Sequence, residues 1–157
     1  MPAQIIKEFL DQNKVKYLSI KHSRAFTAQE IAASAHIDGR KIAKTVVLKV
    51  DGQLVFAVLP ATYKIDFDMF KEALGTENVR LANEQEFMDK CPGCEVGAMP
   101  PMGNLFNIDT YVAASLVEEE EIAFNAGNHT ELIRMNYVDF ERLVQPKLLR
   151  FSHKYKV

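Results

Sequence analysis

A lysine stands at the start of the most apolar stretch of the sequence. Lys44 is followed directly by Thr-Val-Val-Leu-Lys-Val, and in an extended strand its side chain shares a face with Val46 and Leu48. A lysine on an apolar face either extends its ammonium group past the strand end into water or pairs with an anion. Lys44 is therefore a candidate for binding an anionic group, and a strand-end lysine without a further role is the alternative.

Glycine and proline are concentrated in one loop, Val96–Gly103, with the sequence VGAMPPMG. Gly97 permits backbone conformations that other residues avoid, while Pro100 and Pro101 stiffen the chain that follows. A rigid turn with free N–H groups can polarise an ester carbonyl and stabilise the oxyanion that forms on attack. An ordinary surface loop is the alternative.

A single histidine, His129, follows Gly127 and Asn128 in a turn between two expected strands. A lone loop histidine is most often a surface residue, and the four histidines of the chain lack the spacing of metal ligands. The sequence also contains no G-x-S-x-G motif and no cysteine in a nucleophile signature. We therefore expect no metal and no cofactor, and a hydrolase built on this chain would work without a covalent intermediate.

Both cysteines of the chain lie in one motif, Cys91-Pro92-Gly93-Cys94. Such a pair can be redox-active or can supply half of a zinc site. Zinc would need two more ligands, and the motif follows a short helix, whereas in thioredoxin it opens one. The sequence thus favours two thiols without a role, and a thiol-redox protein is a weaker hypothesis. Two cysteines are too few for a disulfide framework, which favours the cytosol.

The elements that must position these residues alternate irregularly between short helices and strands. The strongest signal is an apolar hairpin on an Asp51-Gly52 turn, whose continuously apolar strands predict a sheet covered on both faces. We expect further strands at 15–20, 79–81, 110–113, 121–125 and 131–135, and helices at 2–12, about 27–35 after a Thr27–Glu30 capping box, 67–74, after Asn83, and 137–144. This order predicts an α+β fold, a single domain with a central mixed β-sheet flanked by short helices.

Charge is distributed unevenly along the 157 residues. Residues 1–49 carry +5, residues 50–145 carry −11 and residues 146–157 carry +4, although the net charge is only −2. A protein that binds long nucleic acid is usually basic overall, whereas a local basic patch suffices to contact one end of a polyanion. No apolar run is long enough to span a membrane and the first residues do not form a secretion signal, so we expect a cytoplasmic protein.

Three of these segments, in this order, resemble one family. They are the segment Ala43-Lys44-Thr45-Val46-Val47, the loop Val96–Gly103 and the turn Phe124–His129. Together they are similar to the YbaK/EbsC type of aminoacyl-tRNA deacylases, which are related to the editing domain inserted in bacterial prolyl-tRNA synthetases. The resemblance covers about residues 22–144 of one domain and leaves residues 146–157 as a basic C-terminal tail.

The resemblance implies a trans-editing hydrolase that removes a mischarged small amino acid, alanine or cysteine, from tRNA(Pro). A ribose hydroxyl of the terminal adenosine would help to activate water. The implied partners are the acceptor end of the aminoacyl-tRNA and prolyl-tRNA synthetase. The implied catalytic residues are Lys44, Gly97, Pro101 and His129, and the implied substrate-binding residues are Thr45, Ala98, Met99, Pro100, Met102, Gly103, Asn125 and Gly127.

His129 favours alanine as the amino acid that is removed. Alanine-specific relatives carry a histidine in this neighbourhood, and the cysteine-specific branch generally does not. A different kind of protein stays open as well. No acid, base or nucleophile in the sequence is unmistakable, so the same pocket could belong to a non-catalytic module that binds a nucleotide, the end of a tRNA or a partner protein.

Overall fold

The hairpin predicted at Asp51-Gly52 forms the centre of the structure. Strand β2 (Ile42–Val50) pairs antiparallel with β3 (Gln53–Pro60), in register from Ala43 opposite Pro60 to Val50 opposite Gln53. Asp51 and Gly52 both have positive φ, at 50° and 82°, as a tight hairpin turn of this kind requires. The computed structural model describes residues 2–22 and 37–154, so the helix expected after Thr27 lies outside the described residues.

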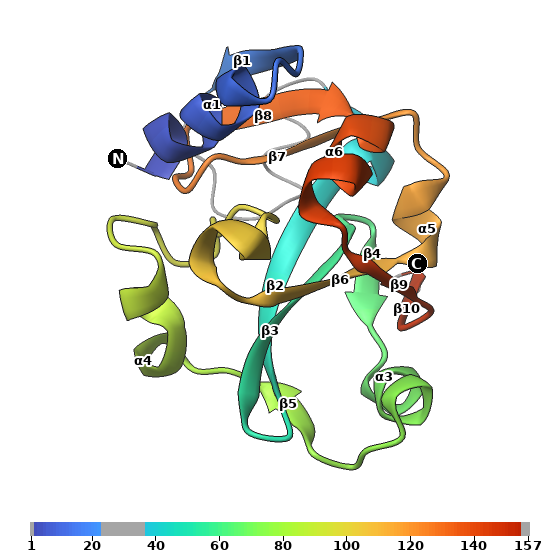
Figure 1. Cartoon of the computed structure of the whole chain (residues 1–157). Coiled ribbons are helices and arrows are strands. Elements are labelled where there is room, and N and C mark those ends of the chain that lie inside the picture. The colour runs from blue at the N-terminus through green and yellow to red at the C-terminus, as the bar shows by residue number, and fades with distance from the viewer. Residues whose placement is uncertain (1, 23–36, 155–157) are drawn as a thin grey trace.

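Eight strands form one mixed sheet around this hairpin (Figure 1). Their order is β1-β8-β7-β2-β3-β6-β9, with β5 also paired to β2, and a separate pair joins β4 to β10. The pairs β2–β7, β3–β6 and β6–β9 are parallel. The strands not yet placed are β1 (Tyr17–Lys21), β4 (Tyr63–Ile65), β5 (Val79–Leu81), β6 (Asp109–Ala113), β7 (Glu121–Asn125), β8 (Glu131–Asn136), β9 (Lys147–Leu149) and β10 (Ser152–Lys154). The predicted fold class, with its central mixed sheet, is confirmed.

Short helices begin and end at the expected capping residues. The Asp66 carboxylate accepts a hydrogen bond from the Met69 N–H at 3.0 Å, and Gly75 ends the same helix with φ of 68°. Asn83 and Glu86 form the predicted capping box. The α-helices are α1 (Pro2–Gln12), α3 (Phe67–Leu74), α4 (Glu84–Phe87), α5 (Ala114–Val117) and α6 (Tyr137–Val144), and 3-10 turns cover Gly39–Lys41, Met88–Lys90 and Gly103–Phe106.

Both faces of the sheet are buried, as the apolar strands predict. Val58 and Phe124 point into a cluster with Ile6 of α1 and Phe140 of α6. Ala57, next to Val58 on β3, points the other way, into a second cluster around Phe70 of α3 that also holds Leu48 of β2 and Phe151. On β2, Ala43 belongs to the first cluster and Leu48 to the second, so residues on the two faces of this strand have different surroundings.

Residues 146–154, the described part of the segment expected as a basic tail, contain two strands. Strand β9 continues the main sheet beside β6, and β10 pairs with β4. Phe151, between these strands, is fully buried, and its ring centroid lies 5.0 Å from that of Phe70. The segment is basic in composition, but it also contains a few apolar residues that complete the core. The described part of the segment therefore belongs to the folded domain.

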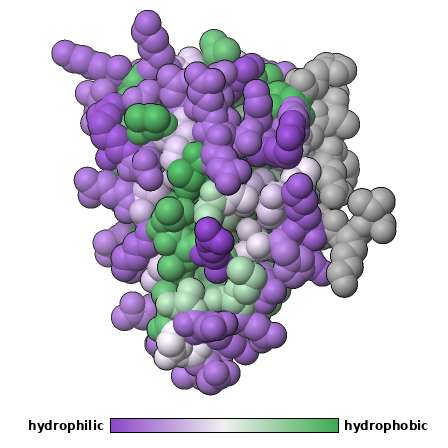
Figure 2. All heavy atoms as spheres, turned by 90° about the vertical axis from the view of Figure 1, so that its right-hand side faces the viewer, coloured by the Kyte–Doolittle hydropathy of each residue, from purple (hydrophilic) through white to green (hydrophobic). Residues whose placement is uncertain are grey.

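Apolar side chains also reach the surface. Figure 2 shows them running down the middle of the face that carries α6, β9 and β10. Val138 of α6 and Leu148 of β9 are 72% and 53% exposed. The loop after α4 lies on the left in Figure 1, away from this face. In the described part of the chain, no helix is both long and apolar enough to cross a membrane.

Candidate functional site

The loop around Gly97 and the turn around His129 lie against each other. The N–H of Glu95 donates to the carbonyl oxygen of Gly127 at 2.8 Å. His129 Nε2 lies 2.6 Å from the carbonyl oxygen of Val96. A carbonyl oxygen can only accept, so Nε2 carries the proton and donates it. Two segments about 30 residues apart in the chain are thus joined by one backbone and one side-chain hydrogen bond.

His129 is not the surface residue that a lone loop histidine would most often be. Its side chain is 3% exposed, and Oε2 of Glu95 lies 3.8 Å from Nε2. A Cβ atom added to Gly97 would lie 3.6 Å from the imidazole Cε1. The ring therefore packs beneath the loop. Sequence reasoning missed Glu95, because nothing in its local pattern relates it to a histidine more than 30 residues away.

Two glycines allow this close approach of loop and turn. Gly97 and Gly127 have φ of 79° and 93°, in the left-handed region that residues with a side chain avoid. A side chain at Gly127 would also collide with Pro2, the first residue of α1. The turn is consequently held between the loop and the amino-terminal helix.

The rest of the Gly97 loop is packed into the core. Met99 contacts the cluster of Val47 and Phe56, and Met102 belongs to the cluster of Ala43 and Val58. A Cβ atom at Gly103 would collide with the Ile108 carbonyl, and its N–H donates to Thr110 Oγ1 at 3.1 Å. All predicted loop residues after Gly97 are buried, namely Ala98, Met99, Pro100, Pro101, Met102 and Gly103. Their packing makes the loop rigid.

A gap in the sheet lies beside this loop. Strand β2 pairs with β7 at Ile42 and Ala43, and with β5 from Leu48 onward, while Val47 accepts a hydrogen bond from the Ala82 N–H. Within residues 2–22 and 37–154, no strand pairs with residues 44–46 on this side. We call this opening the strand gap.

Two predicted substrate-binding residues with buried polar atoms lie beside the strand gap. Thr45 lies on the face of Ala43 and Phe124, and Asn125 lies on the opposite face. Asn125 is the last residue of β7, one position after Phe124, which pairs with Ala43. The side-chain oxygens of Thr45 and Asn125 are buried, and neither has a hydrogen-bond partner among the described residues. A buried polar atom without a partner costs about 1–3 kcal/mol, so such atoms are candidates for contact with a ligand.

Lys44 and the Gly97 loop lie on opposite faces of β2. The neighbours of Thr45 on its own face, Ala43 and Val47, belong to the clusters that contain Met102 and Met99. Lys44 points to the other face, where it lines a groove with a volume of about 240 Å³. Lys44 and the Gly97 loop thus lie at the same stretch of β2 but on opposite faces of it. Among the described residues they do not line one common pocket.

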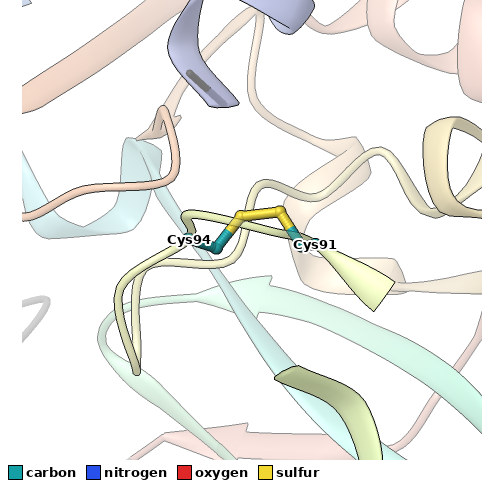
Figure 3. The surroundings of a disulfide bond; sticks show 2 residues. All are labelled: Cys91 and Cys94. Carbon is teal, nitrogen blue, oxygen red and sulfur yellow. A yellow bond between two sulfur atoms is a disulfide. The ribbon is translucent and has the colours of Figure 1, made fainter. Parts of the chain in front are cut away.

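The cysteines form a disulfide, which overturns the expectation of two thiols without a role (Figure 3). Pro92 and Gly93 make a tight turn that brings the two Cα atoms within 5.6 Å, inside the range that a disulfide needs. Cys91 and Cys94 are 2% and 5% exposed and pack in the cluster of Val47 and Met99. A Cβ atom at Gly127 would lie 3.5 Å from Cys94 Sγ, so the crosslink abuts the His129 turn.

An ion pair ties the turn to the amino-terminal helix. Glu131, the first residue of β8, is 7% exposed, pairs with Lys7 and accepts a hydrogen bond from the Ser19 hydroxyl. Burial alone raises the pKa of Glu131, but the contacts with Lys7 and Ser19 outweigh it and hold that pKa below its usual range. In the described part of the chain, no three His, Cys, Asp or Glu residues are placed to hold a metal ion.

Comparisons with known proteins agree on one family. The chain matches the model of the aminoacyl-tRNA editing domain over residues 22–143. It is 33% identical over 114 residues to the multifunctional Ser/Thr-tRNA deacylase ProXp-y of Escherichia coli (strain K12), a match that covers 69% of this chain and 68% of that protein. It is 29% identical over 104 residues to the proline–tRNA ligase of Bacillus cereus (strain AH187), covering 64% of this chain and 18% of the ligase.

A solved structure shares the fold over its whole length. A crystal structure described as a candidate trans-editing enzyme for prolyl-tRNA synthetase superimposes with a TM-score of 0.82 at 18% identity, covering 97% of each chain. The matched range agrees with the resemblance expected over residues 22–144, and the expectation of an aminoacyl-tRNA editing enzyme is confirmed at the level of the family. This chain belongs to the aminoacyl-tRNA editing domain family.

Proposed function

We propose that this protein is a trans-editing deacylase that hydrolyses the ester between a small amino acid and the terminal ribose of a mischarged tRNA. The observation that carries the proposal is the rigid Gly97 loop, which His129 and Glu95 hold beside the strand gap. The N–H of Gly97 has no hydrogen-bond partner among the described residues. It is therefore a candidate to donate to the oxyanion.

In this arrangement the protein promotes the reaction mainly by positioning the ester and the attacking water. Water attacks the ester carbon, the carbonyl electrons move to the oxygen, and the Gly97 N–H donates to that oxygen. The tetrahedral intermediate then expels the ribose oxygen, which receives the proton that the attacking water loses, and a hydroxyl of the same ribose assists this transfer. Thr45, whose side chain shares a face of β2 with Ala43 and Val47 beside the loop, offers its buried hydroxyl oxygen to the amino group of the substrate.

His129 has a positioning role in this mechanism. Its Nε2 donates to the Val96 carbonyl, so that nitrogen is not available as a general base. The hydrogen bond instead fixes the backbone that leads into Gly97. This assignment replaces the catalytic role that the resemblance implied for His129. Pro101 acts in the same indirect way, because it is buried behind the loop.

The amino acid is small in our proposal, with alanine and cysteine on tRNA(Pro) as the first candidates. The ProXp-y relative is named for serine and threonine, which are also small, so a panel must contain all four. The buried, stiff loop supports this size limit, since it cannot move aside for a large side chain. We further propose that the protein acts in the cytoplasm, alongside prolyl-tRNA synthetase, because related domains lie inside proline–tRNA ligases.

Deacylation assays test the proposal directly. Purified protein is incubated with tRNA(Pro) charged with alanine, cysteine, serine, threonine or proline, and the remaining ester is measured over time. Wild type should hydrolyse at least one small-residue ester, and Lys44→Ala and His129→Ala should each slow it about 100-fold. His129→Gln, which can still donate to Val96, should recover part of kcat without a new pH dependence. Lys71→Ala, on α3, is the control.

A non-catalytic module is the second candidate, because the side-chain nitrogen nearest the loop is already engaged. Saturable binding of uncharged tRNA, with no ester of the panel hydrolysed, would support it against the deacylase. Undiminished turnover in Lys44→Ala would also contradict the proposed site.

A further inference from the structure

The first residue of α1 lies between the disulfide turn and the turn that carries His129. A Cβ atom added to Gly127 would collide with the Pro2 ring, and one added to Gly93 would lie 3.4 Å from Pro2 Cδ. Pro2 itself is buried. Figure 1 shows the start of α1, beside the label N, next to the turn that joins β7 and β8. The Pro2 ring therefore fills the space between these two turns.

Helix α1 is firmly attached to the core behind this contact. Pro2, Ile6 and Leu10 follow one another at four-residue spacing and so share one face of the helix. Ile6 and Leu10 are fully buried in the cluster that contains Phe124 of β7. The ion pair of α1 with the first residue of β8 anchors the same helix on the other side of the turn. A proline at the first helical position is also stiff, because its ring fixes φ.

The turn that Pro2 contacts makes the hydrogen bonds that fix the catalytic loop. Gly127 accepts from the Glu95 N–H at 2.8 Å, and His129 donates to the Val96 carbonyl. A movement of the turn would therefore be passed to the backbone that leads into the proposed oxyanion donor. A misplacement of about 1 Å at reacting groups can cost about 100-fold in rate.

We propose that Pro2 is a positioning residue for the deacylation. By filling the space between the two turns, its ring keeps the His129 turn in contact with the Gly97 loop. Helix α1 lies outside residues 22–143, the range that matches the family model, whereas the turn and the loop lie inside it. The effect on rate rests on the proposed function, while the effect of the ring on the turn can be measured without substrate.

Steady-state kinetics test the effect on rate, with the ester that wild type hydrolyses fastest. Pro2→Gly removes the ring and should lower kcat about 5- to 10-fold with KM changed less than about 2-fold, because an interaction that matters in the transition state is misplaced. Pro2→Ala keeps the Cβ atom that faces Gly127 and should recover part of kcat. The matched control is Gln4→Gly, which places a glycine at an exposed position of the same helix and should leave kcat unchanged.

Amide hydrogen exchange measures the turn directly. The Glu95 N–H, which donates to Gly127, should exchange at least about 5-fold faster in Pro2→Gly than in wild type, because this hydrogen bond opens locally. The Met69 N–H, which donates to the Asp66 carboxylate on α3, is the reference amide and should exchange at an unchanged rate. A general loss of stability would speed the exchange of both.

Unchanged kcat in Pro2→Gly would overturn the inference, as would an equal loss of kcat in Gln4→Gly. Equal acceleration of exchange at Glu95 and Met69 would also overturn it, since the ring would then support only the fold. Faster exchange at Glu95 alone, with no ester hydrolysed by wild type, would support the effect of Pro2 on the turn and refute the deacylase.

Discussion

Glu131 shows how one buried carboxylate can hold the site in place. It lies two residues after His129, pairs with Lys7 of α1 and accepts from Ser19 of β1. It is the one acidic residue among the described buried residues. Its backbone carbonyl also accepts a hydrogen bond from the Ala126 N–H, which closes the turn. A substitution at Glu131 should therefore lower the stability of the fold and, as a consequence, loosen the Gly97 loop.

We predict that Glu131→Gln lowers the free energy of unfolding by about 1–2 kcal/mol at neutral pH, because a charged hydrogen bond is lost while Lys7 stays partly hydrated. The folded pKa of Glu131 lies below the unfolded value, so its contribution is present above the unfolded pKa and disappears as pH falls through the folded pKa. Urea unfolding of wild type and variant from pH 7 to about pH 3 should show the difference shrinking. A difference that grows toward low pH, or one matched by the exposed control Glu118→Gln, would contradict this.

At the scale of the elements, the disulfide and the Gly97 loop act as one unit. Cys94 directly precedes Glu95, whose N–H donates to Gly127. Reduction by a dithiol converts the disulfide to two buried thiols and removes a short crosslink, which stabilises by at most about 2 kcal/mol in the chain-entropy model. Disulfides in the cytosol are usually transient or redox-sensing, so a lasting disulfide at this pair would argue against the cytoplasmic location that we propose.

We predict that reduced wild type unfolds at a temperature several degrees lower than oxidised wild type and deacylates more slowly, because the backbone at Glu95 is less constrained. The double variant Cys91→Ala, Cys94→Ala should resemble the reduced protein and should not respond to the dithiol. Thermal unfolding and initial deacylation rates, measured with and without dithiothreitol, check this. Identical rates in both redox states would show that the crosslink does not support the loop.

The helices and strands that the sequence predicted best are those whose turn or capping residues can be recognised locally. The hairpin has its Asp-Gly turn, and α3 has both Asp66 and Gly75. Strands β4, β9 and β10 are three residues long and were missed, since they form by pairing with distant strands. Strand β5 is equally short but was predicted at 79–81. The motifs of the proposed site were recognisable in the sequence, whereas the hydrogen bonds that join Val96 to His129 and Glu95 to Gly127 depend on the sheet order.

At the scale of the whole molecule, the basic amino-terminal third gives a smaller patch than its charge suggests. Arg40 and Asp38 form an ion pair at 2.7 Å, and their hydrogen bonds lower the pKa of Asp38 to about 2. Arg40 is thus neutralised by its neighbour. The proposed contact with the acceptor end of the tRNA therefore relies on few basic side chains, of which Lys44 at the strand gap is one.

A small contact with the acceptor end predicts a shallow salt dependence of RNA binding. Each phosphate neutralised on a single strand contributes about 0.7 to the slope of log Kd against log salt, so an RNA minihelix that ends in single-stranded CCA should give a slope of about 1–2 for two or three contacts. Lys44→Ala should reduce that slope by about 0.7, while Lys71→Ala should leave it unchanged. The acidic centre of the chain, at −11 over residues 50–145, should keep long duplex RNA from binding tightly. Anisotropy titrations from 50 to 300 mM salt measure both quantities, and a slope of 4 or more for either probe would mean that a larger basic surface binds the tRNA.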